Sequence, residues 1–274
     1  MLDNVLEESR RNKRRKIKRG IYLLPNLLTS ASLFGGFYSI VACLDGNFKL
    51  AAAAIFVSAV FDCLDGRIAR LTGTSSKFGV EYDSLSDLVA FGLAPGVLIF
   101  TWGLRPFGRY GWLAAFLYVV CGALRLARFN VQITTVESNR FKGLPVPAAA
   151  MLVASTVLLF TYLGQSETTK HITILILVYC LAFLMVSNVR YYSFKELNLS
   201  RRMPFRLLVG LIFLFVVIAA EPHVMLFVLT LGYVASGPVT MYLDNRERIE
   251  RRFARWRREV WLPGRRGSGG GDLP

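Results

Sequence analysis

The chain has 274 residues, of which 54% are hydrophobic, and its 33 basic residues against 18 acidic ones give a formal net charge of +15. The apolar residues form long runs that are separate from the basic residues, which excludes an ordinary water-soluble domain. A helix needs about 20 apolar residues to cross the hydrocarbon core of a bilayer. Because the runs lack the strict alternation of a membrane barrel, we expect an all-α, polytopic membrane bundle.

In chain order, eight apolar runs predict about eight transmembrane helices, the seventh of them short. They lie at residues 23–44, 48–70, 80–103, 110–129, 146–163, 171–188, 205–220 and 222–243. This divides the chain into a basic tail (1–20), a membrane domain that carries the candidate site (21–243) and a basic C-terminal extension (244–274). A cleavable signal peptide is not expected, because the first run is too long and no small-residue cleavage site follows it.

The distribution of Lys and Arg predicts the orientation. The connections near 71–79, 130–145 and 189–204 hold Lys77, Arg140, Lys142, Arg190, Lys195, Arg201 and Arg202. The opposite connections hold only Lys49, Arg105, Arg109 and Lys170. The positive-inside bias therefore places both termini on the cytoplasmic side of the cell (inner) membrane.

The two basic ends are interpreted as membrane contacts. Anionic lipid headgroups attract basic residues near the surface by about 1 kcal/mol each. Binding to nucleic acid is the weaker reading, because net charge alone is not specific for it. The four cysteines stand singly within apolar runs and show no metal-ligand spacing, so we interpret them as packing residues.

Four aspartates lie between residues 62 and 87, in the stretch DCLDGRIARLTGTSSKFGVEYDSLSD between two apolar runs. On a helix, residues four apart share a face. Two sets have this spacing, with Asp65 one turn from the first residue: Asp62, Gly66 and Arg70, and then Gly79, Asp83 and Asp87. A connection of about eight residues lets the two helices lie antiparallel, so the four carboxylates are predicted to converge at the cytoplasmic edge of the membrane.

Converging carboxylates in a region of low dielectric constant need counter-charges. Four of them can bridge two Mg²⁺ or Mn²⁺ ions about 3.5–4 Å apart, an arrangement typical of phosphoryl chemistry. Gly66 and Ala69 allow a ligand to approach the helix, and Arg70 offers a planar cation to a phosphate. The alternatives are acids that are merely solvated at helix ends, and a carboxylate-lined path for protons or cations.

These residues fit the pattern D-x2-D-G-x2-A-R-x8-G-x3-D-x3-D at every position. The pattern resembles the signature of the CDP-alcohol phosphatidyltransferases. The resemblance implies transfer of a phosphatidyl group from a CDP-linked lipid to an alcohol, with release of CMP. It further implies two metal ions on the first three acids, and Asp87 as both a metal ligand and the base. The implied contacts of the CDP-lipid are Gly66, Ala69, Arg70, Ser76 and, from the segment PNLLT, Asn26 and Thr29.

The segments GALRLARFN (122–130), FKGLPVPAA (141–149) and SNVRYYSFK (187–195) resemble those of integral-membrane phosphatidylserine synthases. The resemblance implies CDP-diacylglycerol and L-serine as substrates and a homodimer. Serine carries a carboxylate that glycerol-type acceptors lack. Its candidate contacts are Arg125, Arg128, Asn130 and Lys142.

Other readings stay open at this stage. Arg128 is as well explained by anchoring at the interface, whereas Arg125 lies deeper in its apolar run. Glycerol phosphate or inositol phosphate is an alternative acceptor. An ether lipid is an alternative donor.

Overall fold

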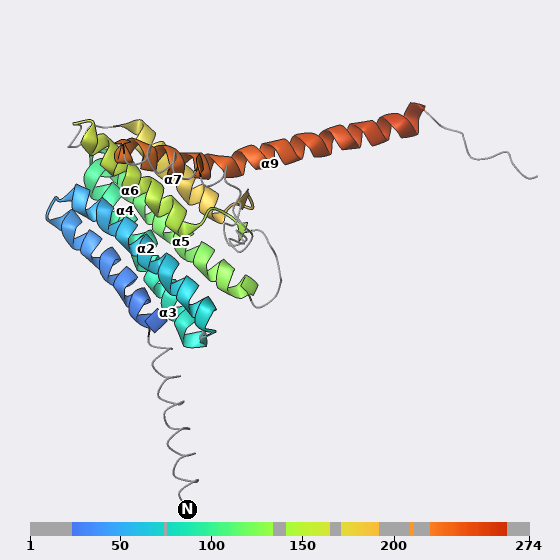
Figure 1. Cartoon of the computed structure of the whole chain (residues 1–274). Coiled ribbons are helices and arrows are strands. Elements are labelled where there is room, and N and C mark those ends of the chain that lie inside the picture. Colours follow the sequence, from blue (N-terminus) through green and yellow to red (C-terminus); the bar gives the residue numbers. More distant parts are fainter. Residues whose placement is uncertain are drawn as a thin grey trace, which may run out of the picture.

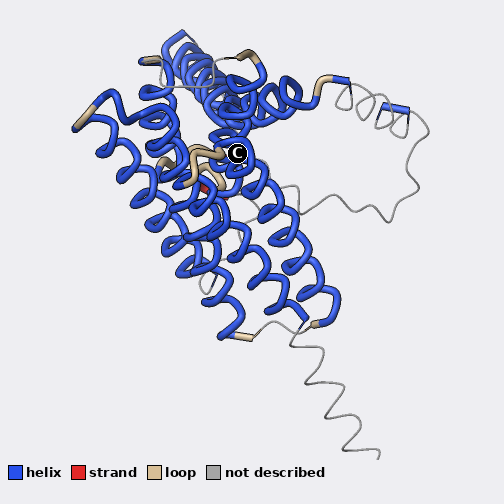
Figure 2. Tube along the Cα trace, turned by 90° about the vertical axis from the view of Figure 1, so that its left-hand side faces the viewer, coloured by secondary structure: helices blue, strands red, loops and turns tan. Residues whose placement is uncertain are grey.

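The computed structural model describes residues 24–73, 76–133, 141–164, 171–191, 209–210 and 220–261, and of side chains after Leu243 only that of Arg246. The described part is helical apart from one two-residue antiparallel ladder between β1 (Phe141–Lys142) and β2 (Arg190–Tyr191) (Figures 1 and 2). The all-α prediction is therefore confirmed.

The helices follow the predicted apolar runs closely over the first 190 residues. An N-terminal helix covers Leu24–Leu44. It is followed by α2 (Phe48–Thr72), α3 (Lys77–Asp87), α4 (Ala94–Ile99), α5 (Arg109–Ile133), α6 (Val146–Tyr162), α7 (Ile172–Val186) and α9 (Pro222–Trp261). A π-helical turn (Leu88–Leu93) joins α3 to α4, and a second one (Phe100–Leu104) with a 3₁₀ turn (Arg105–Phe107) continues the rod to Phe107.

Four helices in the described part are long and apolar enough to cross a membrane. They are Leu24–Leu44, Lys77–Phe107, Arg109–Val131 and Pro222–Leu243. Two shorter apolar helices are Val146–Tyr162 and Ile172–Val186. The predicted run at 205–220 lies outside the described residues except at 209–210 and 220. The structure thus supports a helical membrane protein with at least these spans, while the count of eight is not established.

The N-terminal helix packs very closely against α2 and against the turn that follows α3. Ser32 and Ser58 each donate a side-chain hydrogen bond to the other's carbonyl oxygen, at 3.1 and 3.0 Å. A Cβ atom at Gly36 would lie 2.5 Å from the Cα atom of Ala90, so only glycine permits this approach. Further along, the Ser30 and Tyr82 hydroxyls are 2.8 Å apart and join the same helix to α3. These contacts fix the three helices that carry the aspartates and the segment PNLLT.

α6 and α9 pack antiparallel on the other side of the bundle. The rings of Tyr162 and His223 stack at 5.0 Å, and the hydroxyls of Ser155 and Thr230 are 3.0 Å apart. The hydroxyl of Tyr191 donates to the carbonyl oxygen of Val234 at 3.1 Å. The later part of α9 extends far beyond the bundle (Figure 1). The contacts place the start of α9 beside the end of α6, and place Val234 beside β2.

Candidate active site

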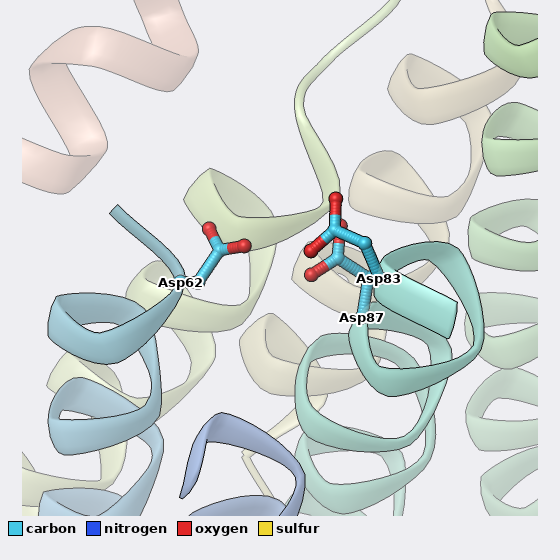
Figure 3. Close-up of side chains that lie close together, drawn as sticks. All are labelled: Asp62, Asp83 and Asp87. Carbon is cyan, nitrogen blue, oxygen red and sulfur yellow. The ribbon is translucent and has the colours of Figure 1, made fainter. Parts of the chain in front are cut away.

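The second half of α2 and the second half of α3 bring three aspartates together. One carboxylate oxygen from each of Asp62, Asp83 and Asp87 lies within 4.8 Å of the others. Figure 3 shows Asp62 on α2 facing Asp83 and Asp87, which both project from the α3 side. α2 ends at Gly73, whose φ of 63° is in the left-handed region that glycine tolerates. The four-residue spacing of the aspartates thus predicted correctly which faces of α2 and α3 meet.

The fourth aspartate, Asp65, is adjacent to this cluster but turns toward the N-terminal helix. The Thr29 hydroxyl donates to its Oδ2 atom at 2.7 Å, and the two residues are only 5% and 4% exposed. Its charge still interacts with those of Asp62 and Asp87. The structure thus brings three of the four predicted metal ligands together, with Asp65 held beside them by Thr29.

The donor set fits a hard divalent cation. Carboxylate oxygens are the ligands that Mg²⁺ and Mn²⁺ prefer, and oxygens on one ion at 2.0–2.6 Å lie within about 5 Å of each other. Three carboxylates at this spacing repel one another, and a bound cation removes that repulsion. Asp62 and Asp83 would hold the ion together with Asp87. Asp65 is not one of these three, but its charge interacts with that of Asp62.

An open space lies beside Gly66, on the same face of α2 as Asp62. In the described part of the chain, leaving aside the two neighbours of Gly66 and its own helix backbone, a Cβ atom built on Gly66 would have one atom within 4 Å, Nη1 of Arg70 at 3.7 Å. Ala69 is partly buried on the same helix. A phosphate or base can therefore approach this helix backbone next to an arginine, as the sequence predicted for Gly66, Ala69 and Arg70.

Asn26 and Ser76 lie near the first turn of α3. The exposed Ser76 caps this helix, because its Oγ atom accepts a hydrogen bond from the Gly79 amide at 2.9 Å. A Cβ atom on Gly79 would lie 3.5 Å from the Oδ1 atom of Asn26. The structure thus places two predicted nucleotide contacts at one helix end. Thr29 differs from them, since its hydroxyl is buried against Asp65.

Arg125 of α5 is a buried cation behind the aspartates. It is 8% exposed, and its Nε atom is buried without a hydrogen-bond partner in the described structure. Its guanidinium lies over the ring of Phe129, 5.8 Å from the ring centroid. Its charge interacts with the carboxylate of Asp87 and with Tyr233 of α9. A buried guanidinium with an unused donor is suited to bind a carboxylate through two hydrogen bonds.

Arg128 and Asn130, two of the other predicted serine contacts, have protein partners. Arg128 donates from Nη2 to Oδ1 of Asn188 at 2.7 Å and from Nη1 to the Val186 carbonyl at 3.4 Å, which ties α5 to the end of α7. The Asn130 side chain donates to the Ser84 hydroxyl at 2.9 Å. The backbone of Lys142 pairs with Arg190, and its side chain lies outside the described part.

Two features of the site were missed by the sequence analysis. The first is the role of Thr29 as a donor to Asp65, because the motif does not specify which side chain meets which across helices. The second is Tyr233, which lies in the eighth predicted run and approaches Arg125 across the bundle. No local pattern in the sequence marks Tyr233, so its place near Arg125 can be identified only from the fold.

Together, the fold and the site indicate the class of protein to which this chain belongs. Helices of membrane-spanning length and an inward-facing carboxylate cluster at one helix end describe a membrane-embedded enzyme with a site suited to a divalent cation. The CDP-alcohol phosphatidyltransferase family matches residues 22–186, which is more than half of the chain. The chain belongs to this family.

Several curated relatives are similar to most of this chain. A CDP-diacylglycerol–serine O-phosphatidyltransferase of Helicobacter pylori (strain ATCC 700392 / 26695) is 41% identical over 196 residues, covering 72% of this chain and 83% of the relative. The protein of that name from Mycobacterium leprae (strain TN) is 31% identical over 85% of this chain and 79% of its own. The archaetidylserine synthase of Methanothermobacter thermautotrophicus is 36% identical over 61% and 69%.

Proposed function

We propose that this protein transfers the phosphatidyl group of CDP-diacylglycerol to the hydroxyl of L-serine, giving phosphatidylserine and CMP. Family membership and the names of the relatives support this chemistry. The observation that carries the choice of acceptor is the buried Arg125, whose unpartnered Nε atom and nearby Asp87 suit an acceptor with both a carboxylate and a hydroxyl.

The donor lies with its acyl chains in the inner leaflet and its cytidine beside Gly66, Ala69 and Asn26. Arg70 binds a phosphate oxygen, and Ser76 lies at the same edge of the site. Two Mg²⁺ or Mn²⁺ ions on Asp62, Asp65, Asp83 and Asp87 would supply positive charge to the phosphoryl oxygens in the transition state.

The acceptor enters from the cytoplasm and its carboxylate binds to Arg125, with Asn130 and Lys142 nearby as weaker candidates. Asp87 takes the proton from the serine hydroxyl, and the serine oxygen forms a bond to the lipid-side phosphorus. The bond from that phosphorus to the oxygen of CMP breaks, and CMP leaves with the electron pair. Among the candidate serine contacts, Arg128 has the strongest structural explanation, because its hydrogen bonds tie α5 to the end of α7.

An ether-lipid donor is the second candidate, favoured by the archaetidylserine synthase among the relatives. The residues that contact the reacting atoms are the same for both donors, since acyl and ether lipids differ only toward the chains. A transporter for protons or cations is disfavoured by family membership.

We also propose that the membrane domain, residues 21–243, crosses the cell (inner) membrane eight times. The tail 1–20, the extension 244–274 and the active site then all lie on the cytoplasmic side of this membrane. Tyr191 lies beside the start of α6, whereas His223 stacks on Tyr162 at the end of α6. Tyr191 and His223 thus lie toward opposite ends of α6, which supports one further crossing near 205–220. The basic ends contact anionic headgroups, and the protein acts as a homodimer.

The test is CMP release by purified protein supplied with Mg²⁺, CDP-diacylglycerol and one acceptor at a time. We expect labelled serine to give labelled phosphatidylserine with equimolar CMP, and glycerol phosphate or inositol phosphate to give none. Asp87→Asn should lower the rate of CMP release by about 10²–10⁴-fold. Asp45→Asn, which changes an exposed aspartate outside the site, should leave it unchanged. Release of CMP with glycerol phosphate or inositol phosphate but not with serine would overturn the acceptor assignment.

A further inference from the structure

α9 lies outside the residues matched by the family, yet one of its residues, Tyr233, interacts with Arg125 of the candidate site. The match ends at residue 186, whereas α9 covers Pro222–Trp261. α9 is nevertheless docked at a defined register, because the hydroxyl of Tyr191 bonds the Val234 carbonyl at 3.1 Å. A Cβ atom on Gly237 would collide with the ring of Tyr191, so the helix approaches this ring closely.

This docking brings Tyr233 within electrostatic range of the buried Arg125. The rings of Tyr233 and Tyr191 are 5.8 Å apart and tilted by 40°. Tyr233 is partly buried, and it is close enough to Arg125 for the two groups to interact electrostatically. The guanidinium also lies over the ring of Phe129 on its own helix. Arg125 thus has a ring of α5 and a tyrosine of α9 as neighbours, and both restrict its side chain.

This restriction is relevant because an arginine side chain has many rotamers, and fixing them costs conformational entropy. A carboxylate bound through Nε and one Nη atom requires the guanidinium plane in one orientation. The unpartnered Nε atom of Arg125 shows which edge of the plane is available for such a ligand.

We propose that Tyr233 is a positioning residue that holds the Arg125 guanidinium in the orientation needed to bind the carboxylate of the acceptor. This inference rests on the proposed function. It assigns to α9 a part in selecting the acceptor, while the family-matched segment carries the donor site and the aspartates. Tyr233 acts through Arg125 and does not contact the reacting phosphorus.

The test compares Tyr233→Phe with Tyr191→Phe in full-length protein, using steady-state CMP release. Both variants lose one hydroxyl at the contact between β2 and α9, but only Tyr233 interacts with Arg125. We expect Tyr233→Phe to raise the KM for serine about 10-fold, with kcat and the KM for CDP-diacylglycerol within about twofold. Tyr191→Phe should lower thermal stability and leave the KM for serine within about twofold.

A double-mutant cycle tests whether Tyr233 acts through Arg125. In an Arg125→Lys protein, adding Tyr233→Phe should lower kcat/KM for serine no further. Three outcomes would overturn the inference and leave the proposed function standing. They are equal effects of the two tyrosine variants on the KM for serine, an unchanged KM for serine in Tyr233→Phe, and independent losses of kcat/KM in the double variant. A wild-type protein that releases no CMP with serine would overturn the proposed function, and the inference with it.

Discussion

Replacing Thr29 by Val tests how the fourth aspartate is held. The change keeps the shape of the side chain and removes the hydroxyl that donates to Asp65 at 2.7 Å. Both residues are almost fully buried, so water cannot replace the lost donor. A hydrogen bond to a charged group contributes about 1.5–3 kcal/mol to the free energy of unfolding. A loss near 2 kcal/mol should lower the apparent Tm by about 4–8 °C in a protein of this size.

The activity of Thr29→Val should change with the metal concentration. Because Asp65 lies beside the other three aspartates, its misplacement should raise the Mg²⁺ concentration that gives half-maximal CMP release. Thr29→Ser keeps the donor and should restore both measurements. Ser155→Ala, which loses a hydroxyl contact between α6 and α9, should lower Tm without changing the Mg²⁺ dependence.

The sequence predicted a different role for Thr29, namely a direct contact with the CDP moiety. That role requires Thr29→Val to raise the KM for CDP-diacylglycerol while Tm and the Mg²⁺ dependence stay at their wild-type values. Such a result would refute the reasoning from burial.

Three further predictions concern the metal, the base and the topology. EDTA should abolish CMP release and added Mg²⁺ or Mn²⁺ should restore it; full activity after rigorous chelation would contradict the metal site. Asp87→Asn should lower kcat by about 10²–10⁴-fold and still bind CDP-diacylglycerol, whereas Asp83→Asn should lose metal binding. Near-normal turnover of the Asp87→Asn variant would exclude Asp87 as the base. Reporter fusions after residue 260 and within 130–145 should both read as cytoplasmic, and an external signal from either would overturn the span count.

The sequence was sufficient to predict most of the local structure of this site. Helical spacing alone places Asp62 on one face of α2 and Asp83 and Asp87 on one face of the facing helix, and these three carboxylates do meet. The long apolar runs predicted the helices from residue 24 to residue 186 to within a few residues at most ends. Both predictions depend on periodicity within one helix, which the order of the residues determines directly.

Contacts between helices were less predictable. Asp65 is three residues after Asp62, so its side chain points about 60° away around the helix axis, and spacing does not decide whether it faces the cluster or a third helix. The N-terminal helix decides it, since Thr29 offers a buried donor at that position. The π-helical turn directly after Asp87 was also not predicted, because no residue pattern marks it. Its residue Ala90 lies directly against Gly36 of the N-terminal helix.

Arg125 and Arg128 show why the acceptor site in particular needs the fold. In the sequence they are one turn apart near the end of the same apolar run, and each could be a ligand or an anchor. In the structure Arg128 donates to Asn188 and Val186, so its hydrogen bonds are accounted for by α7. Arg125 instead keeps a buried Nε atom without a partner, which costs free energy unless a ligand accepts from it. The unsatisfied donor therefore favours Arg125 over Arg128 as the residue that binds the carboxylate of serine.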